Sequence, residues 1–193
     1  MTAGVKRPAL PKSDGHEPWT RAEVEAFRTR WSIGTVQRAI FEMLHWTGAR
    51  ISDPVKIGRG MVGADGVLTF KQTKTGDLAY VPWTCLLPHF AAAMQADRDM
   101  MHEALKACAG HMTFLATKQG RSRSAKAIGG DLAKSAWLAG VNKTAHGLRK
   151  TLATALADGG ATTFQVASWT GHQSLSEVQH YTKSAERKRA VMG

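Results

Sequence analysis

The sequence predicts a mainly α-helical domain that carries a small antiparallel β-sheet, an α+β fold. Most of the chain shows apolar residues at helical spacing, between residues that typically begin or end helices. Residues 67–81 instead show two short strand-like runs around a polar turn. The chain has 193 residues, of which 43% are hydrophobic and 21% are charged. That length and balance suit one globular domain with a real core.

The N-terminal half shows three helix signals. Thr20 and Glu23 have capping-box spacing, which predicts a helix that begins at the next residue. Gly48 is a typical helix stop after a run of apolar residues, and Ser52 can cap a short helix. The helices expected in this half cover about residues 21–31, 35–46 and 52–57.

A β-hairpin should follow these helices. The strand-like runs 67–70 and 78–81 flank a polar stretch that contains Thr75 and Gly76. Pro82 should end the second strand, because proline cannot donate a hydrogen bond to a neighbouring strand.

The C-terminal half is predicted to be helical, apart from one short strand. Glycines at positions 140, 159 and 171 each follow a segment with helical spacing and should end it. The elements expected here are a helix over 85–107, a strand over 112–115, and helices over 127–139, 147–158, 163–169 and 174–181.

Residues 1–18 are rich in Pro, Lys, Gly and Ser and show no periodicity. We therefore expect a disordered or linker-like arm, with ordered structure beginning at Trp19. The chain shows neither an apolar signal-peptide core nor a run of about 18 apolar residues. We therefore expect the protein to stay in the cytoplasm and not to bind membranes.

The charge of the chain is the first indication of function. Lysine and arginine total 26 against 15 acidic residues, which gives a formal net charge of +11 and a pI near 10.1. Such an excess predicts a polyanionic partner, and double-stranded DNA fits better than a membrane surface. A well-solvated surface is the alternative explanation, so charge alone favours nucleic acid only modestly.

No metal or other cofactor is expected. Cys85 and Cys108 lack metal-ligand spacing, and we expect two reduced thiols. The sequence contains no glycine-rich phosphate-binding loop and no cluster of His, Asp and Glu ligands.

Four short patterns carry residues suited to chemistry. Alone, each has an ordinary explanation, such as a surface arginine, an edge-strand lysine, a helix-cap histidine or a core tyrosine. Their joint order along one chain is the stronger signal. The patterns are Thr47-Gly48-Ala49-Arg50, Lys74-Thr75-Gly76, His146-Gly147-Leu148-Arg149, and Gly171-His172 followed by Tyr181.

In this order the patterns resemble the catalytic segments of the phage integrase (tyrosine recombinase) family, over roughly residues 19–188. Two positions depart from the family's pattern. Gly147 stands where aspartate is more usual, and Thr170 stands where leucine is usual. The resemblance implies a tyrosine recombinase catalytic domain over residues 19–193. We expect the family's N-terminal core-binding domain to be absent, because the stretch before the first expected helix is too short to form it.

The resemblance also implies a reaction, in which the hydroxyl of Tyr181 attacks a DNA phosphodiester and forms a 3′-phosphotyrosyl link. Arg50 and Arg149 would clamp the phosphate oxygens, because guanidinium groups offer forked donors that stay protonated. Asp53 would either orient Arg50 or a histidine, or be a plain carboxylate in the first turn of a helix.

Three further residues would move protons or bind the phosphate. His146 would assist proton removal from the nucleophile, and His172 would donate a hydrogen bond to a non-bridging oxygen. Lys74 is expected to protonate the leaving 5′-oxygen. Lys71 is the reserve candidate, because the sequence does not reveal the register of the hairpin.

Other basic residues are expected to hold DNA phosphates without reading bases. In the family, active assemblies are tetramers on DNA, so a homotetramer on DNA is expected, with a monomer in free solution left open. The tail over residues 184–193 is short, and docking in cis, in trans or not at all is left open. The expected DNA-binding residues are Lys71, Lys118, Arg121, Arg123, Lys126, Lys143 and Lys150.

Two rival functions remain open from sequence alone. A type IB topoisomerase uses a similar set of residues to relax DNA, although the Lys-Thr-Gly and Thr-Gly-His segments look more like those of integrases. A non-catalytic DNA-binding module is the other alternative. Because no DNA-clamping domain is expected, we predict weak DNA binding with strand cleavage or relaxation activity for this chain.

Overall fold

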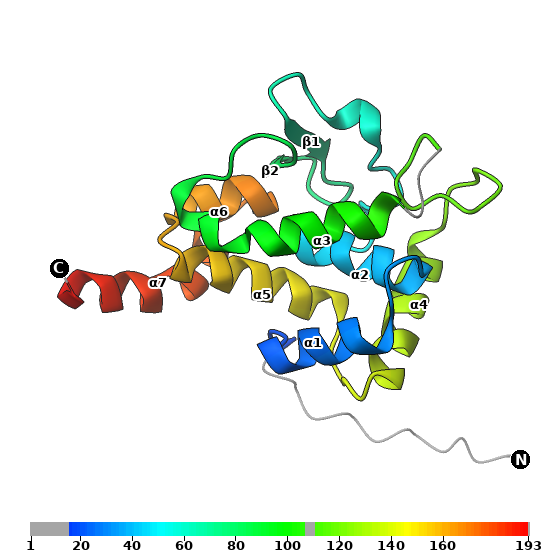
Figure 1. Ribbon diagram of the computed structural model, residues 1–193. Helices are drawn as coiled ribbons and strands as arrows, with labels where there is room; N and C mark the ends of the chain where they lie inside the picture. The colour runs from blue at the N-terminus through cyan, green and yellow to red at the C-terminus, as the bar shows by residue number, and fades with distance from the viewer. Residues whose placement is uncertain (1–15, 107–110, 193) are drawn as a thin grey trace, which may run out of the picture.

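A computed structural model describes residues 16–106 and 111–192. Within these residues the chain is mainly helical with one two-stranded sheet, as expected (Figure 1). Residues 1–15 of the expected arm lie outside the described residues, whereas residues 16–18 are described. The elements are α1 (Arg21–Arg30), α2 (Val36–Thr47), η1 (Arg59–Met61), β1 (Val67–Lys71), β2 (Leu78–Pro82), η2 (His89–Met94), α3 (Gln95–Lys106), α4 (Ala125–Leu138), α5 (Ala145–Asp158), α6 (Thr163–Thr170) and α7 (Leu175–Met192).

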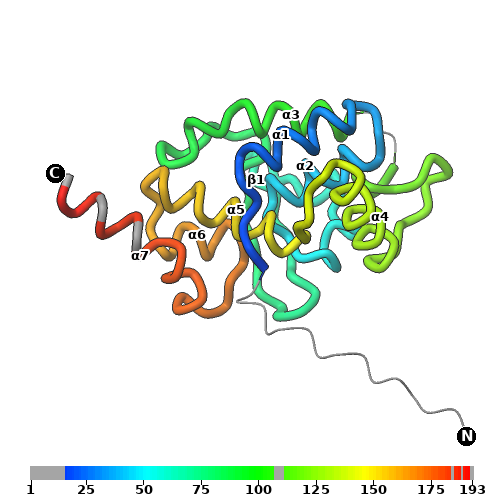
Figure 2. Tube along the Cα trace, turned by 90° about the horizontal axis from the view of Figure 1, so that it is seen from below, coloured from blue at the N-terminus to red at the C-terminus, as the bar shows by residue number. Residues whose placement is uncertain are grey.

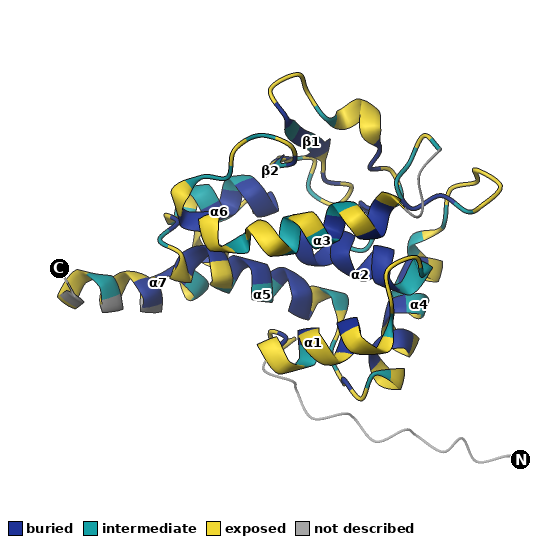
Figure 3. Ribbon diagram, viewed as in Figure 1, coloured by how far each residue is buried: buried dark blue, intermediate teal, exposed yellow. Residues whose placement is uncertain are grey.

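Helices α2 and α5 lie at the centre of the molecule and pack against each other (Figure 1). Helices α3 and α4 pack on α2, while α6 and α7 pack on α5. Figure 3 shows the buried positions gathered on α2, α5 and α6, with exposed positions on the outer faces of α1 and α3. This packing brings the end of α2 close to the first half of α5.

Side-chain caps explain where several helices begin. Thr20 accepts a hydrogen bond from the Glu23 backbone N–H, and the Glu23 carboxylate accepts from the Thr20 backbone N–H, so the predicted capping box is confirmed. Thr35 caps α2 through the Arg38 backbone N–H. A second capping box, which the sequence analysis did not predict, begins α6.

The predicted hairpin is confirmed, with Val67 opposite Pro82 and Lys71 opposite Leu78. Two tryptophan hydrogen bonds join β2 to α2 and α6 to α2. Trp46 Nε1 of α2 donates to the Pro82 carbonyl oxygen at 3.1 Å. Trp169 Nε1 of α6 donates to the Trp46 carbonyl oxygen at 3.1 Å. The end of β2 that lies away from the turn is thereby attached to α2, and α2 is attached to α6.

The predictions for three elements were wrong. Residues 52–57 form turns and not a helix, and residues 112–115 form bends and turns and not a strand. The helix expected over 85–107 begins only at Gln95, after the six-residue 3-10 helix η2. Pro88 explains part of this difference, because proline restricts the preceding residue to extended conformations.

Helix α7 is much longer than expected. It runs for 18 residues, so Tyr181 lies within the helix and not at its end. Val178 and Thr182 are fully buried on its inner side. Figure 2 shows the last turns of α7 extending away from the body of the molecule. Among the described helices, none has the length and apolar character needed to cross a membrane.

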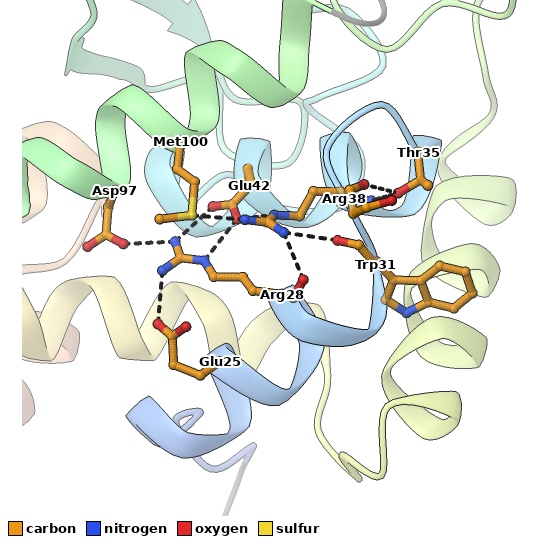
Figure 4. A network of polar contacts seen from close by, with 9 residues as sticks. Glu25, Arg28, Trp31, Thr35, Arg38, Glu42, Asp97 and Met100 are labelled. Atoms are coloured by element: carbon orange, nitrogen blue, oxygen red, sulfur yellow. Dashed lines mark hydrogen bonds and ion pairs between the residues drawn. The ribbon is translucent and has the colours of Figure 1, made fainter.

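A buried ion-pair network joins α1, α2 and α3 (Figure 4). The Glu42 carboxylate accepts from Arg28 Nε and Nη2, both at 2.9 Å, and from Arg38 Nε at 2.6 Å. Arg28 also donates to Asp97 at 2.8 Å. Burial alone would lower the pKa of Arg28, but its hydrogen bonds to Glu42 and Asp97 raise it. The network explains how the fold accommodates two buried guanidinium groups.

We expect Glu42→Gln to lower the free energy of unfolding by about 3–5 kcal/mol, because removing one partner of a buried ion pair leaves uncompensated charge. Urea denaturation measures this effect. Glu103→Gln is the matched control, since Glu103 pairs with Lys106 on the surface and its loss should change stability far less than the loss of Glu42. Equal effects of the two substitutions would contradict the prediction.

Candidate active site

The end of α2 directs the chain into the predicted site. Gly48 adopts a left-handed conformation with φ 60°, and its N–H donates to the Leu44 carbonyl oxygen. A Cβ atom at position 48 would lie 2.8 Å from Leu152 Cδ2, so a side chain here would also force Leu152 to shift. Two residues later, Arg50 projects from this turn and is only partly exposed.

Arg149 is buried in the first half of α5, with 2% of its surface exposed. Its Nη1 donates to the Gly48 carbonyl oxygen at 2.7 Å and to the Thr170 carbonyl oxygen at 2.6 Å. These carbonyl groups lie at the C-terminal ends of α2 and α6, where the helix dipole favours a positive charge. The guanidinium group is therefore held by two helix ends.

His172 is held between Arg149 and Thr170. The Thr170 hydroxyl lies 2.6 Å from both the Val166 carbonyl oxygen and His172 Nδ1. The hydroxyl uses its hydrogen to donate to the carbonyl oxygen, so it must accept the hydrogen bond from Nδ1–H of the ring. Nε2 of the neutral ring is then an acceptor, and Arg149 Nε donates to it at 3.3 Å. In this arrangement the ring lies between Thr170 and Arg149 and contacts both. The donation from His172 to a phosphate oxygen stays a prediction.

Two guanidinium groups lie in the same region and repel each other. Arg50 Nη1 and Arg149 Nη2 are buried and have no hydrogen-bond partner among the described residues. Burial, and then the positive charge of Arg50, lower the pKa of Arg149 to about 10. Unpaired buried donors and like-charge repulsion both cost free energy, and a bound anion would relieve both.

These arginines line a hollow of about 470 Å³, which we call the arginine hollow. Partial burial, and then the nearby charges of His16 and Arg149, lower the pKa of His146, which favours a neutral imidazole at pH 7. The hollow thus combines anion-binding groups with a neutral base. Its polar lining comes from His16, Arg50, Lys74, Thr144, His146 and Arg149.

Tyr181 lies on α7 close to Arg149, although it does not line the hollow. Its ring is half-buried against the core. Burial raises the pKa of the Tyr181 hydroxyl, while the charge of Arg149 acts to lower it. Next to it, the buried Thr182 hydroxyl lies 2.8 Å from that of Thr163 on α6. The phenol therefore sits on a firmly packed helix beside a guanidinium group.

The hairpin turn is anchored to the same region by Gln72, whose Nε2 donates to the Thr170 carbonyl oxygen at 2.5 Å. Asp53 is buried, and its Oδ1 accepts from the Thr73 N–H at 2.8 Å. Asp53 therefore joins the loop after α2 to the hairpin. It makes no hydrogen bond to Arg50 or to a histidine, and the first-turn helical position also considered for it is absent.

The two lysines of the hairpin differ in position. Lys74 lines the arginine hollow, whereas Lys71 lies on the other side of the turn, in a depression shared with Asp53 and Lys56. Both side chains are exposed. The geometry thus favours Lys74 over Lys71 as the lysine of the site.

The expected DNA-binding residues occupy varied environments. Lys118, Arg121 and Lys126 are exposed, whereas Arg123 and Lys150 are partly buried. Lys143 instead forms an ion pair with Glu17, and its Nζ lies 4.0 Å from Glu23 Oε1. Within the described parts of the chain, no group of three or more His, Cys, Asp or Glu side chains is arranged to hold a metal ion.

Three residues near the site were missed by the sequence analysis as functional candidates: His16, Gln72 and Thr170. His16 lies in the stretch assigned to the arm, where no pattern exists to reveal a long-range contact. Thr170 was noticed only as a departure from leucine, and that departure was the available signal. Its hydroxyl is what holds the His172 ring.

We expect the protein to become less stable as the pH falls below about 6.5. Burial and neighbouring positive charges, Arg149 first, lower the pKa of His172 from 6.5 to about 3. Between these values the unfolded chain binds a proton that the folded chain does not, so the free energy of unfolding falls with falling pH. Urea denaturation across this range measures the slope.

His172→Asn should make that slope shallower without abolishing it, because His45 and His146 also have lowered pKa values. The exposed His89 provides the matched control, since His89→Asn should leave the slope unchanged. If both substitutions changed the pH dependence of the unfolding free energy equally, the result would contradict the assignment of this dependence to His172.

Comparison with known proteins identifies the family. A model of the phage integrase family matches residues 22–188. The chain belongs to the phage integrase family. Tyrosine recombinase XerC of Lacticaseibacillus casei is 30% identical over 187 residues, which cover 90% of this chain and 60% of the relative. Tyrosine recombinase XerD of Corynebacterium glutamicum is 31% identical over 150 residues, with 75% and 47% coverage. The chain therefore spans three fifths or less of these phage integrase family relatives.

Solved structures confirm the expected fold class. Lambda integrase bound to DNA superposes with a TM-score of 0.68 at 20% identity, covering 89% of this chain and 61% of that one. XerA recombinase has a TM-score of 0.68 at 18% identity, with 95% and 66% coverage. The lambda integrase catalytic core has a TM-score of 0.58 at 19% identity, with 87% and 91% coverage. This phage integrase family member thus has the fold of a tyrosine recombinase catalytic domain.

Proposed function

We propose that this chain cleaves and rejoins DNA strands through a 3′-phosphotyrosyl intermediate, and that residues 19–193 form its catalytic domain. The observation that carries the proposal is the pair Arg50 and Arg149. Each has a buried guanidinium nitrogen that has no hydrogen-bond partner in the part of the chain that the structure describes, and the two charges repel each other. A phosphodiester between them would accept both free donors and neutralise the repulsion.

The proposed cleavage step assigns one task to each group. The Tyr181 oxygen forms a bond to phosphorus, and the bond from phosphorus to the 5′-oxygen breaks. His146 takes the phenol proton, directly or through water, and Lys74 gives a proton to the leaving 5′-oxygen. Arg50 and Arg149 stabilise the charge that develops on the non-bridging oxygens. Rejoining is the reverse, with a 5′-hydroxyl as the attacking group.

The half-buried His172 and the buried Asp53 support these groups without lining the arginine hollow. His172 orients Arg149 by accepting from its Nε, and its low pKa keeps the ring neutral and able to accept. Asp53 holds the hairpin turn that carries Lys74, through its hydrogen bond to Thr73. Neither residue needs to contact the phosphate for this role.

We propose double-stranded DNA as the partner, bound by a homotetramer. The net charge of +11 and the exposed basic residues favour a polyanion. A solved lambda integrase dimer is bound to a core site, and a solved lambda integrase tetramer is bound to a Holliday junction. The remaining basic residues proposed to hold phosphates are Lys71, Lys118, Arg121, Arg123, Lys126, Lys143 and Lys150.

A suicide-substrate assay tests this proposal. The protein is incubated with a pool of end-labelled, randomised duplexes that carry a nick, so that a short fragment is lost after cleavage. We expect a covalent protein–DNA adduct that survives denaturant, and joining of the trapped strand to an added 5′-hydroxyl oligonucleotide. Relaxation of supercoiled plasmid without joining to foreign ends would favour a type IB topoisomerase. DNA binding without any adduct would favour a non-catalytic module.

A further inference from the structure

The segment before α1 lies against the first half of α5, beside the arginine hollow (Figure 2). The Trp19 backbone N–H donates to Thr151 Oγ1 at 2.7 Å, and Trp19 Nε1 donates to the Thr144 carbonyl oxygen at 2.9 Å. Glu17 forms an ion pair with Lys143. The segment is therefore attached to α5 by contacts over most of its length.

Gly147 is what allows this close approach. A Cβ atom at position 147 would lie 2.5 Å from the Glu17 carbonyl oxygen and 2.9 Å from Trp19 Cδ1. Any other residue would displace the segment, because real Cβ atoms essentially never come so close to a backbone oxygen. Glycine at position 147 thus makes room for a segment that a side chain would displace.

The consequence is a second imidazole beside His146. The ring centroids of His16 and His146 are 5.2 Å apart, with an interplanar angle of 59°. His16 Nδ1 lies 3.1 Å from the hydroxyl of Thr144, the N-cap of α5. That contact restrains the ring of His16 at the edge of the hollow. His16 and His146 both line the hollow, next to Arg50 and Arg149.

We propose that His16 is a positioning residue, which restrains the His146 ring and sets the charge around it, and that Gly147 is the residue that admits it. This inference rests on the proposed function of His146 as the proton acceptor. His16 itself need not touch the substrate.

The charges around His146 explain the expected effect of His16. The groups that face it are His16 from the segment before α1, Arg149 and Lys150 from α5, Arg50 from the loop after α2, and His172 from the loop after α6. All of them disfavour a positive imidazole. After burial, His16 contributes most to the lowered pKa of His146. Protonation of His146 would place its positive charge beside these groups, and their repulsion disfavours it.

The first test replaces His16 in the full chain and follows both proton binding and cleavage. In His16→Gln, NMR titration of the ¹⁵N-labelled His146 ring should give a higher pKa than in the unsubstituted protein. The rate of cleavage of the nicked duplex pool should then fall by about tenfold at pH 6 relative to the unsubstituted protein. This loss is smaller than the rate enhancement that a general base typically contributes. Activity above pH 8 should recover. The matched control is the exposed His89, since His89→Gln should change neither reading.

The second test displaces the segment without touching either histidine. Gly147→Ala should reproduce the shift in the His146 titration and in the pH profile. The double variant His16→Gln/Gly147→Ala should lose little more activity than either single variant, because both substitutions remove the same contact between His16 and His146. Thermal melting of each variant shows whether a loss of activity comes from unfolding. The pKa of His146 is measured under conditions in which the variant is folded.

The results separate this inference from the proposed function. An unchanged His146 titration and pH profile in His16→Gln, with normal adduct formation, would overturn the inference and leave the proposed function intact. A shifted His146 titration in a protein that never forms an adduct would support the contact between the rings and count against the proposed function.

Discussion

Replacing Tyr181 by phenylalanine should abolish the covalent protein–DNA adduct completely while leaving DNA binding unchanged. The substitution removes only the hydroxyl, which is the proposed nucleophile and for which no other group can substitute. The ring keeps its packing against the core, so stability should change by no more than about 0.5 kcal/mol. Denaturing gel analysis of the nicked-duplex reaction measures the adduct, and filter binding measures affinity.

The chain offers a matched control, because it contains two tyrosines. Tyr80 on β2 is 47% exposed and lies outside the arginine hollow. Tyr80→Phe should therefore form the adduct at the normal rate. An adduct that persists in Tyr181→Phe and disappears in Tyr80→Phe would assign the nucleophile to the other tyrosine.

Replacing Arg149 by lysine should lower the cleavage rate by about 10²–10³-fold, the loss typical of removing one donor that stabilises a developing negative charge. Lysine keeps the charge but cannot reproduce the guanidinium geometry. Arg149 binds the Gly48 and Thr170 carbonyl oxygens and His172 while keeping one nitrogen free. A single ammonium group cannot occupy all these positions. Single-turnover cleavage of the nicked duplexes measures the loss.

Arg21→Lys is the control for this substitution, since Arg21 is exposed on α1, away from the arginine hollow. Its cleavage rate should stay normal. Circular dichroism at the assay temperature ensures that the rates compare folded proteins, because Arg149→Lys also removes hydrogen bonds from two buried carbonyl groups. A cleavage rate for Arg149→Lys within a few-fold of normal would contradict its role as a clamp.

Local signals in the sequence predicted most helices and the hairpin correctly. The capping box of Thr20 and Glu23, the stop at Gly48 and the turn around Gly76 are interactions within a few residues, so short stretches contain them. The expectations failed where distant packing decides the structure. Helix α7 continues past Tyr181 because Thr182 and Ala185 are buried on it, and no local pattern signals that burial.

Some features of the candidate site could likewise be predicted from the sequence, and others depend on distant packing. The types and order of Arg50, Lys74, His146, Arg149 and Tyr181 were visible in the sequence, because the family's chemistry requires those side chains. Which of their atoms are free to bind an anion was not visible. Arg149 donates to a carbonyl oxygen 101 residues away, and that partner exists only because α2 packs against α5.

The sequence by itself thus determined the fold class, the family and the set of candidate site residues. Only the tertiary structure decided that Lys74 and not Lys71 lines the arginine hollow, that the His172 ring faces Arg149, and that a second histidine stands beside His146. The physical reason is the same in each case. The sequence gives the type of each side chain directly. Which donors stay unpaired, and which charges surround a group, depend on which distant segments pack together.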